Sequence, residues 1–194
     1  YVHCHPKYNC RCTIYNSSFN KGCQRATSNV NYFIAAALIV DSARQRYFTS
    51  FEPIFYDFLT QLLPDSGLVV SYERGWSSDW RLDAALEESK QRDFKRGFTH
   101  HGPHRADLKL TINGLNAGQV LSRGQQKLVV CALKLAQCQL MIREASRGCI
   151  LLIDDLPAEI DHIHQAKLCR LLDGLNLDVF EFFFSFCQTH DLLV

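Results

Sequence analysis

Residues 121–127 read Leu-Ser-Arg-Gly-Gln-Gln-Lys and begin the most clearly helical part of the chain. Ser122 is a favourable N-cap, and Gln125, three residues later, completes a capping-box pattern. The helix start also presents a hydroxyl and backbone N–H groups that lack helical partners, which suits a phosphate. We predict a largely buried helix from Ser122 to about Ala145, because apolar residues cover much of its circumference. These residues are Leu128, Val129, Ala132, Leu133, Leu135, Ala136, Leu140 and Met141.

Residues 149–161 follow this helix and read Cys-Ile-Leu-Leu-Ile-Asp-Asp-Leu-Pro-Ala-Glu-Ile-Asp. The apolar run 149–153 is typical of a strand buried on both faces, as in parallel sheets. Asp154 and Asp155 would then lie at the carboxyl edge of the sheet, where open α/β proteins bind ligands. In a nucleotide hydrolase, such an Asp holds Mg²⁺ through water, and the next carboxylate can orient or deprotonate the attacking water.

Each of these two stretches alone is a common structural feature. A strand that ends in two Asp residues and a capped helix both occur without any chemistry. Their order, together with Glu159 and Asp161 after the strand, indicates the second half of an ABC-type ATPase head.

Further elements are predicted from periodicity on both sides of these stretches. Apolar residues from Asp41 to about Pro64, beginning with Ala43 and Tyr47, indicate a helical face, which we expect Pro53 to divide into two helices. In the predicted helix 80–96, the inward stripe is Leu82, Ala85, Leu86 and Ser89. The other expected elements are strands at 68–72, 108–112 and 179–186 and a helix at 162–175, with a turn at Asn113-Gly114.

The composition is that of a folded protein with an unusual N-terminal segment. The chain has 194 residues, 47% hydrophobic residues and a formal net charge of +1. Residues 1–40 carry four basic groups, no acidic ones and four of the nine cysteines. No apolar run approaches the roughly 18 residues of a membrane span, and we expect a cytoplasmic protein with no membrane partner.

Three interpretations of the N-terminal segment stay open. His3, Cys4, His5, Cys10, Cys12 and Cys23 are metal-binding residue types, but their spacing fits no common zinc pattern. The segment could also be disordered. We favour a third interpretation, in which residues 1–37 are out of frame and the Phe-rich residues 181–194 are a second such segment.

A basic cluster lies between the predicted helix 80–96 and the strand 108–112. It contains His100, His101, His104 and Arg105, and it lies beside Lys95 and Arg96 at the end of the helix. Such a cluster can contact the phosphates of DNA, and His104 and Arg105 are our candidates. A solvated loop is the structural alternative. Trp76 and Trp80 could stack on bases, although a Trp in an apolar lobe is more often part of a core.

With these residues in place, the sequence resembles the RecF recombination proteins. Residues 121–127 look like their signature motif, which reads LSxGQxK, and residues 102–108 (Gly-Pro-His-Arg-Ala-Asp-Leu) match a segment that precedes it. Residues 150–161 resemble the Walker B motif and D-loop. The helical lobe is similar at residues 43–47 and 53–55 and at the Gly75-Trp76 pair.

The resemblance implies the C-terminal part of an α/β ABC/SMC-type P-loop ATPase head with a helical lobe. Residues 38–98 would form the lobe, and residues 99–180 the signature and Walker B part. Such proteins are ATP-dependent, bind DNA and act in recombinational repair at single-strand gaps. They work with RecO and RecR to help load RecA, and they support replication and SOS induction.

The resemblance also implies a role for each matching residue. Ser122, Gly124 and Gln125 would contact the ATP held by a partner subunit of a homodimer. Asp154 would serve Mg²⁺ through water, and Asp155 would occupy the position of the catalytic carboxylate. Glu159 and Asp161 would line the dimer interface.

One departure from the family pattern bears on activity. None of the ten glycines is followed by Lys, so no Gly-x-x-x-x-Gly-Lys-Ser/Thr loop is present, and we expect the P-loop half to be missing. We therefore hypothesise that this chain alone hydrolyses no ATP, which turnover abolished by Asp154→Asn would refute. The alternatives are a non-catalytic remnant that binds only DNA or a protein, and half of a related chromosome-maintenance or transporter head.

Overall fold

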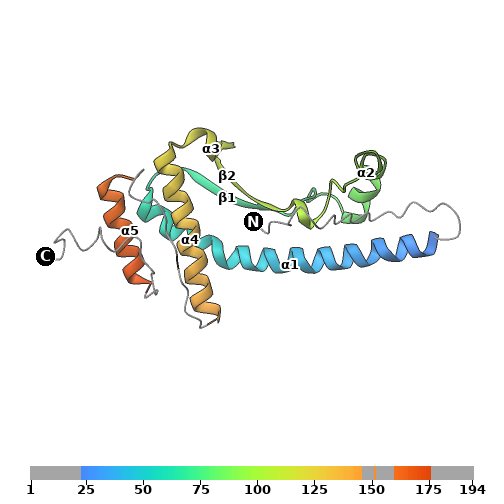
Figure 1. Cartoon of the computed structure of the whole chain (residues 1–194), viewed down its shortest axis with the longest axis horizontal. Coiled ribbons are helices and arrows are strands. Elements are labelled where there is room, and N and C mark those ends of the chain that lie inside the picture. Colours follow the sequence, from blue (N-terminus) through green and yellow to red (C-terminus); the bar gives the residue numbers. More distant parts are fainter. Residues whose placement is uncertain (1–22, 146–150, 152–159, 176–194) are drawn as a thin grey trace, which may run out of the picture. The chain divides into compact units, whose positions relative to one another are not determined.

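The computed structural model describes residues 23–145, 151 and 160–175, which form two compact units (Figure 1). Unit 1 comprises residues 1–46 and 72–108, and unit 2 comprises residues 47–71 and 109–194. Both units are discontinuous in sequence, and we describe each by itself. The division into a lobe at 38–98 and a head part at 99–180 stays a prediction.

Helix α1 runs from Cys23 to Leu62 as one continuous helix of 40 residues, with Pro53 inside it. Our expectation that Pro53 divides this region into two helices is therefore wrong. A proline inside a helix removes one hydrogen bond and costs about 3 kcal/mol. Phe51, Ile54 and Phe55 are all buried around it, and burying side chains of this size contributes about 1.5–3 kcal/mol each. Packing therefore outweighs the local preference for a break.

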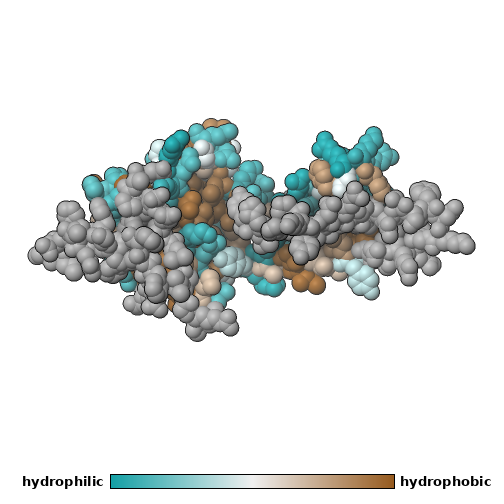
Figure 2. Space-filling model, viewed as in Figure 1, coloured by the Kyte–Doolittle hydropathy of each residue, from teal (hydrophilic) through white to brown (hydrophobic). Residues whose placement is uncertain are grey.

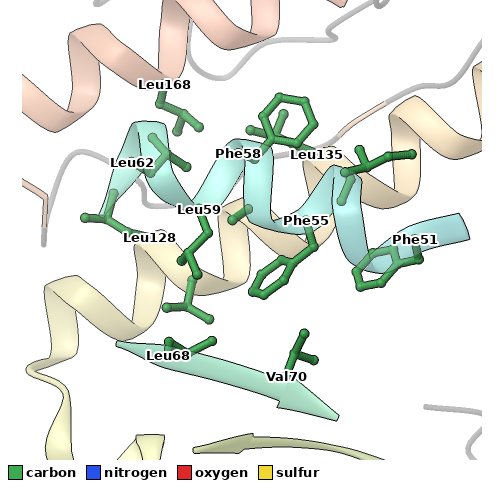
Figure 3. Close-up of a cluster of buried hydrophobic side chains, with 14 of the residues drawn as sticks. Phe51, Phe55, Phe58, Leu59, Leu62, Leu68, Val70, Leu128, Leu135 and Leu168 are labelled. Carbon is green, nitrogen blue, oxygen red and sulfur yellow. The ribbon is translucent and has the colours of Figure 1, made fainter. Parts of the chain in front are cut away.

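The core of unit 2 surrounds the last three turns of α1 (Figure 3). Strand β1 (Leu68–Glu73) covers one side of α1 with Leu68 and Val70. Helices α4 (Arg123–Ala145) and α5 (His162–Gly174) add further buried side chains. Those labelled in Figure 3 on these two helices are Leu128, Leu135 and Leu168. All of these elements except the full length of α1 match the predicted ones.

Three residues that we placed on buried faces are exposed. Met141, near the end of α4, is 50% exposed. Ala43 and Tyr47, which we assigned to the apolar face of the first helical region, are also exposed. Leu140 beside Met141 and Asp41 beside Ala43 are buried, so the exposed residues lie on outward faces of α4 and α1, and helical periodicity alone overestimates the width of the buried face.

A three-stranded sheet has the order β1-β2-β3. Strand β2 (Asp107–Ile112) pairs antiparallel with β3 (Leu115–Asn116), with Ile112 opposite Leu115. The Asn113-Gly114 turn has positive φ at both residues, 51° and 80°, which confirms the predicted turn; its pairing of β2 with β3 was not predicted. The short helix α3 (Ala117–Val120) follows directly, capped by the side chain of Asn116, which accepts from the Gly118 N–H.

Unit 1 has a smaller core around helix α2 (Leu82–Arg96). The predicted inward stripe of α2 is confirmed, because Leu82, Ala85, Leu86 and Ser89 are all buried. The 3-10 turn η1 (Pro103–Arg105) precedes β2. Hydrophilic residues dominate the visible surface of α2 (Figure 2, upper right).

The predicted strands at 149–153 and 179–186 lie outside the described residues, apart from Leu151. In the part of the chain that is described, no helix is long and apolar enough to cross a membrane.

Candidate nucleotide and nucleic-acid sites

The start of α4 has the predicted capping box. The backbone N–H of Ser122 donates to Oε1 of Gln125 at 3.0 Å, and the N–H of Gln125 donates to Oγ of Ser122 at 3.3 Å. Each residue thereby satisfies a backbone donor of the other. The N–H groups of Arg123 and Gly124 belong to the first turn, where an α-helix offers no acceptor of its own. Both side chains of the box are exposed, so this helix end is accessible.

Gln126 holds the chain in place just before this helix end. Its side-chain amide donates to the carbonyl oxygens of Gly118 at 3.0 Å and Leu121 at 2.9 Å. Leu121 also donates its N–H to the carbonyl of Ala117 at 2.9 Å. These bonds link α3 to the first turn of α4, so the position of Ser122 is set by more than its own cap.

Asp161 begins α5 as its N-cap. Its Oδ1 accepts from the N–H of His164 at 3.0 Å, and its Oδ2 lies 2.6 Å from Nδ1 of the same residue. These hydrogen bonds lower the pKa of the Asp161 carboxyl. The carboxylate is therefore engaged within its own helix, and its predicted place in a dimer interface stays a prediction.

Three other predicted site residues, Asp154, Asp155 and Glu159, lie outside the described residues. The N-terminal metal-binding candidates lie outside them as well, except Cys23, which falls within α1. Among the described residues, no group of three or more His, Cys, Asp and Glu side chains could hold a metal ion.

The segments of unit 1 that carry the resemblance converge in space. Arg44 Nη1 of α1 donates to the carbonyl oxygen of Pro103 at 2.5 Å. The N–H of Gly102 donates to the carbonyl of Gly75 at 3.2 Å. At Gly75 the φ angle is +95°, and a Cβ there would overlap the Gly102 carbonyl oxygen and lie 2.8 Å from the Ala106 nitrogen. The Gly75-Trp76 and Gly102–Leu108 segments are thus fitted to each other through their backbones.

An ion pair extends this junction. Arg74 Nη2 lies 3.0 Å from Oδ2 of Asp41, and the Tyr72 hydroxyl donates to Oδ1 of Asp41 at 3.2 Å. Burial, and then the Asp41 charge, raise the pKa of the Tyr72 phenol. The Arg74 guanidinium also lies 4.1 Å from the centre of the Trp76 ring. Trp76 is buried in the core of unit 1, so the core interpretation of this residue is correct and base stacking on it is excluded.

Two side chains of the basic cluster have defined contacts within unit 1. Nε2 of His104 lies 2.9 Å from the Thr99 carbonyl oxygen, so this nitrogen carries a proton and donates it. The Arg105 guanidinium lies 5.8 Å from the centre of the Phe98 ring. The role of His104 and Arg105 as DNA contacts stays a prediction, but one N–H of His104 is already used.

A buried carboxylate that sequence reasoning missed lies beneath this cluster. Asp93 is only 4% exposed and accepts from the Ser89 hydroxyl at 2.9 Å. It also accepts from the backbone N–H of His100 at 3.2 Å and contacts Nδ1 of that residue at 2.5 Å. Arg96 Nη1 lies 3.2 Å from Nε2 of the same imidazole. The signal in the sequence was a Ser and an Asp four residues apart on the inward side of a helix.

The described cysteines behave as expected for small buried residues. Cys131, Cys138 and Cys169 are free thiols, of which Cys138 is buried and the other two are partly buried. Burial raises the pKa of Cys131 to about 11, against a small lowering effect of Lys127.

Curated proteins similar to this chain are RecF proteins. The chain is 47% identical over 159 residues to the DNA replication and repair protein RecF of Pseudomonas fluorescens (strain Pf0-1). It is 46% identical over 159 residues to RecF of Pseudomonas putida (strain W619). Each match covers 81% of this chain and 42% of the relative. The chain therefore spans less than half the length of these proteins.

Solved structures give the same answer for the fold. A structure of the recombination mediator protein RecF-ATP in the RecFOR pathway matches with a TM-score of 0.68 and 23% identity, over 84% of this chain and 45% of that one. A structure of RecF-ATPrS matches with a TM-score of 0.57 and 26% identity, over 70% and 38%. No protein-family model matches the chain.

These likenesses confirm the expected fold class, part of an ABC/SMC-type ATPase. The sequence identity extends over about four fifths of the chain, and the curated relatives share one name. The chain is a RecF homologue and corresponds to the C-terminal part of these proteins.

Proposed function

We propose that this chain supplies the signature half of a RecF-like, ATP-dependent DNA-binding protein of recombinational repair. ATP held by a second subunit would meet the start of α4, so that the nucleotide joins two subunits into a homodimer. In this role the protein acts in the cytoplasm at single-strand gaps, with RecO and RecR, to help load RecA. It also supports replication and SOS induction.

The observation that supports this proposal most strongly is the accessible, capped start of α4. First-turn N–H groups and the positive end of the helix dipole attract a phosphate. The Ser122 hydroxyl can rotate and donate to a phosphate oxygen while its Oγ still accepts from Gln125. Gly124 has no side chain that could keep a phosphate away from the backbone. Ser122, Gly124 and Gln125 would thus contact the terminal phosphate.

The remaining roles depend on residues outside the described part of the chain. Carboxylate and water oxygens are the ligands that Mg²⁺ prefers, so Asp154 has the right chemistry to hold this ion through water. Bound Mg²⁺ would neutralise charge on the phosphates. Asp155 would orient or deprotonate the attacking water, and Glu159 would lie at the dimer interface with Asp161.

An intact relative offers a direct test. The chain would be mixed with full-length RecF of Pseudomonas fluorescens, and complex formation measured by sedimentation with and without ATPγS and Mg²⁺. We expect association that requires the nucleotide and is lost in Ser122→Arg, which places a bulky side chain at the helix start. Val130→Arg introduces the same side chain at an exposed position farther along α4 and should leave association unchanged. Association without nucleotide, or association unaffected by Ser122→Arg, would contradict the proposal.

The basic cluster of unit 1 favours one alternative function. Lys95, Arg96 and Arg105 are exposed, and none of them belongs to the ATP-contacting set. A chain that only binds DNA or a protein partner, without any role for ATP, would still need such a surface. DNA binding that persists while ATPγS-dependent association is absent would favour this alternative.

A further inference from the structure

Two arginines of unit 1 are linked through a pair of neighbouring rings that are tilted relative to each other. The rings of Phe98 and His100 have centroids 4.8 Å apart and an interplanar angle of 30°. Arg96 contacts Nε2 of His100 on one side of this pair, and the Arg105 guanidinium lies over the Phe98 ring. Two guanidinium groups from different elements, the end of α2 and the turn η1, are therefore placed around one small cluster.

The hydrogen bonds define the protonation state of His100. A guanidinium can only donate, so the contact with Arg96 requires that Nε2 of His100 accept. Nδ1 then carries the proton and donates it to Asp93. Asp93 is a buried carboxylate with Ser89 as a further donor. The hydrogen bonds Ser89–Asp93–His100–Arg96 thus form a polar network that runs from the interior to the surface and ends in a cation.

Such a polar network contributes little to the stability of the folded state. Burying a carboxylate and its polar partners is often no more stabilising than apolar packing in the same volume. The network instead holds the Arg96 guanidinium on a fixed acceptor, Nε2 of His100. This contact uses one of the five N–H donors of the guanidinium and leaves other donors available. Among the described residues, no carboxylate forms an ion pair with Arg96 or Arg105, whereas Nη2 of Arg92 on α2 lies 3.8 Å from Oε2 of Glu88.

We propose that Arg96 and Arg105 form a binding site for the phosphates of a DNA strand, and that Asp93 positions Arg96 through His100. This inference rests on the DNA-binding part of the proposed function and names the residues that carry it. Lys95 adds a third positive charge at the end of α2. The contacts are to phosphates, so binding is independent of base sequence and falls steeply with salt.

The binding test uses the full chain and a fluorescently labelled 20-nucleotide oligothymidylate, with anisotropy titrations at several salt concentrations. Arg96→Gln and Arg105→Gln should each weaken binding roughly tenfold and reduce the slope of log K against log salt by about 1. Arg92→Gln removes the same charge from the same helix but from an existing ion pair, and should change affinity less than about twofold. Wild-type affinity in Arg96→Gln, or equal losses in all three variants, would overturn the proposal.

The positioning role of Asp93 has a spectroscopic signature. In the wild-type chain, nitrogen chemical shifts of His100 should show the tautomer protonated at Nδ1. Asp93→Asn should shift the tautomer equilibrium and weaken DNA binding, with no further loss when combined with Arg96→Gln. Additive losses in the double variant, or an unchanged tautomer, would overturn this role. Tryptophan fluorescence of each variant verifies that unit 1 is folded, because both Trp residues lie in it.

A competition arm distinguishes DNA from a small phosphate. Inorganic phosphate at 1 mM, at constant ionic strength, should not displace the oligonucleotide. Displacement that disappears in Arg96→Gln would mean that the site takes a free phosphate group, and would overturn the assignment to DNA. Absence of any DNA binding by the wild-type chain would also refute the inference, but would leave ATP-dependent association through Ser122 untouched.

Discussion

Among the described residues, the cluster of buried hydrophobic side chains in unit 2 has nineteen members, whereas that of unit 1 has five. Unit 1 is held in addition by the Asp41–Arg74 ion pair, the Arg44–Pro103 hydrogen bond and the polar chain that begins at Ser89. Burial is non-directional and tolerates small shifts. Ion pairs, hydrogen bonds and backbone contacts instead depend on orientation. We therefore expect unit 2 to respond to lost volume and unit 1 to altered geometry.

Removing volume from unit 2 should have the largest effect. Phe55 is fully buried at the centre of the cluster and lies against Phe51 with ring centroids 5.9 Å apart. Phe55→Ala should lower the free energy of unfolding of unit 2 by about 3–5 kcal/mol. Denaturant titration followed by far-UV circular dichroism measures this loss. Val130→Ala, on an exposed position of α4, should cost less than about 0.5 kcal/mol, and an equal cost of both changes would contradict the expected role of burial.

A change in backbone geometry should lower the stability of unit 1 more than a loss of volume does. In Gly75→Ala, the new methyl group would overlap the Gly102 carbonyl oxygen and strain a backbone with positive φ. We expect a loss of about 2–4 kcal/mol, from backbone strain and overpacking together. Fluorescence of Trp76 and Trp80 reports on unit 1.

Gly97→Ala is the matched control for this change. Gly97 is in the same unit and has a φ of +74°, but a Cβ there meets nothing within 4 Å. It should cost only the backbone strain, about 1 kcal/mol. If Gly75→Ala were no worse than Gly97→Ala, the close fit of the two segments would not be what stabilises unit 1.

The same contrast explains what the sequence could predict. The capping box of Ser122 and Gln125, the inward stripe of α2 and the Asn113-Gly114 turn are local patterns, and all three were predictable from the sequence. Continuity of α1 through Pro53 was not, because it depends on packing by β1, α4 and α5, which lie far away in the sequence. The Asp93–His100 contact joins a helix to a loop, and no periodicity signals it. The capped start of α4 was therefore predictable, while the hydrogen bonds from Asp93 through His100 to Arg96 required the structure.

Stability of unit 2 should also depend on pH through Cys131. Burial raises the pKa of this thiol from 9.0 to about 11, so the folded state binds the proton more tightly than the unfolded state. The resulting stabilisation is complete below pH 9 and is lost as the pH rises towards 11, by about 2–3 kcal/mol in total. Comparing the wild-type chain with Cys131→Ala over this range removes the contribution of other titrating groups. Parallel curves for the two proteins would show that the thiol is not desolvated.

The smallest effect should come from the cap of α4. Ser122→Ala removes the acceptor of the Gln125 N–H and should destabilise unit 2 by about 1 kcal/mol. Ser122→Gly should lower the stability by only a few tenths of a kcal/mol. The loss should appear in the circular-dichroism transition and leave the tryptophan transition of unit 1 in place. A cost of several kcal/mol would mean that Ser122 supports packing as well as capping. In that case a loss of nucleotide-dependent association in any Ser122 variant would reflect unfolding of the helix start, and only variants with the wild-type transition could be used to assign a phosphate contact.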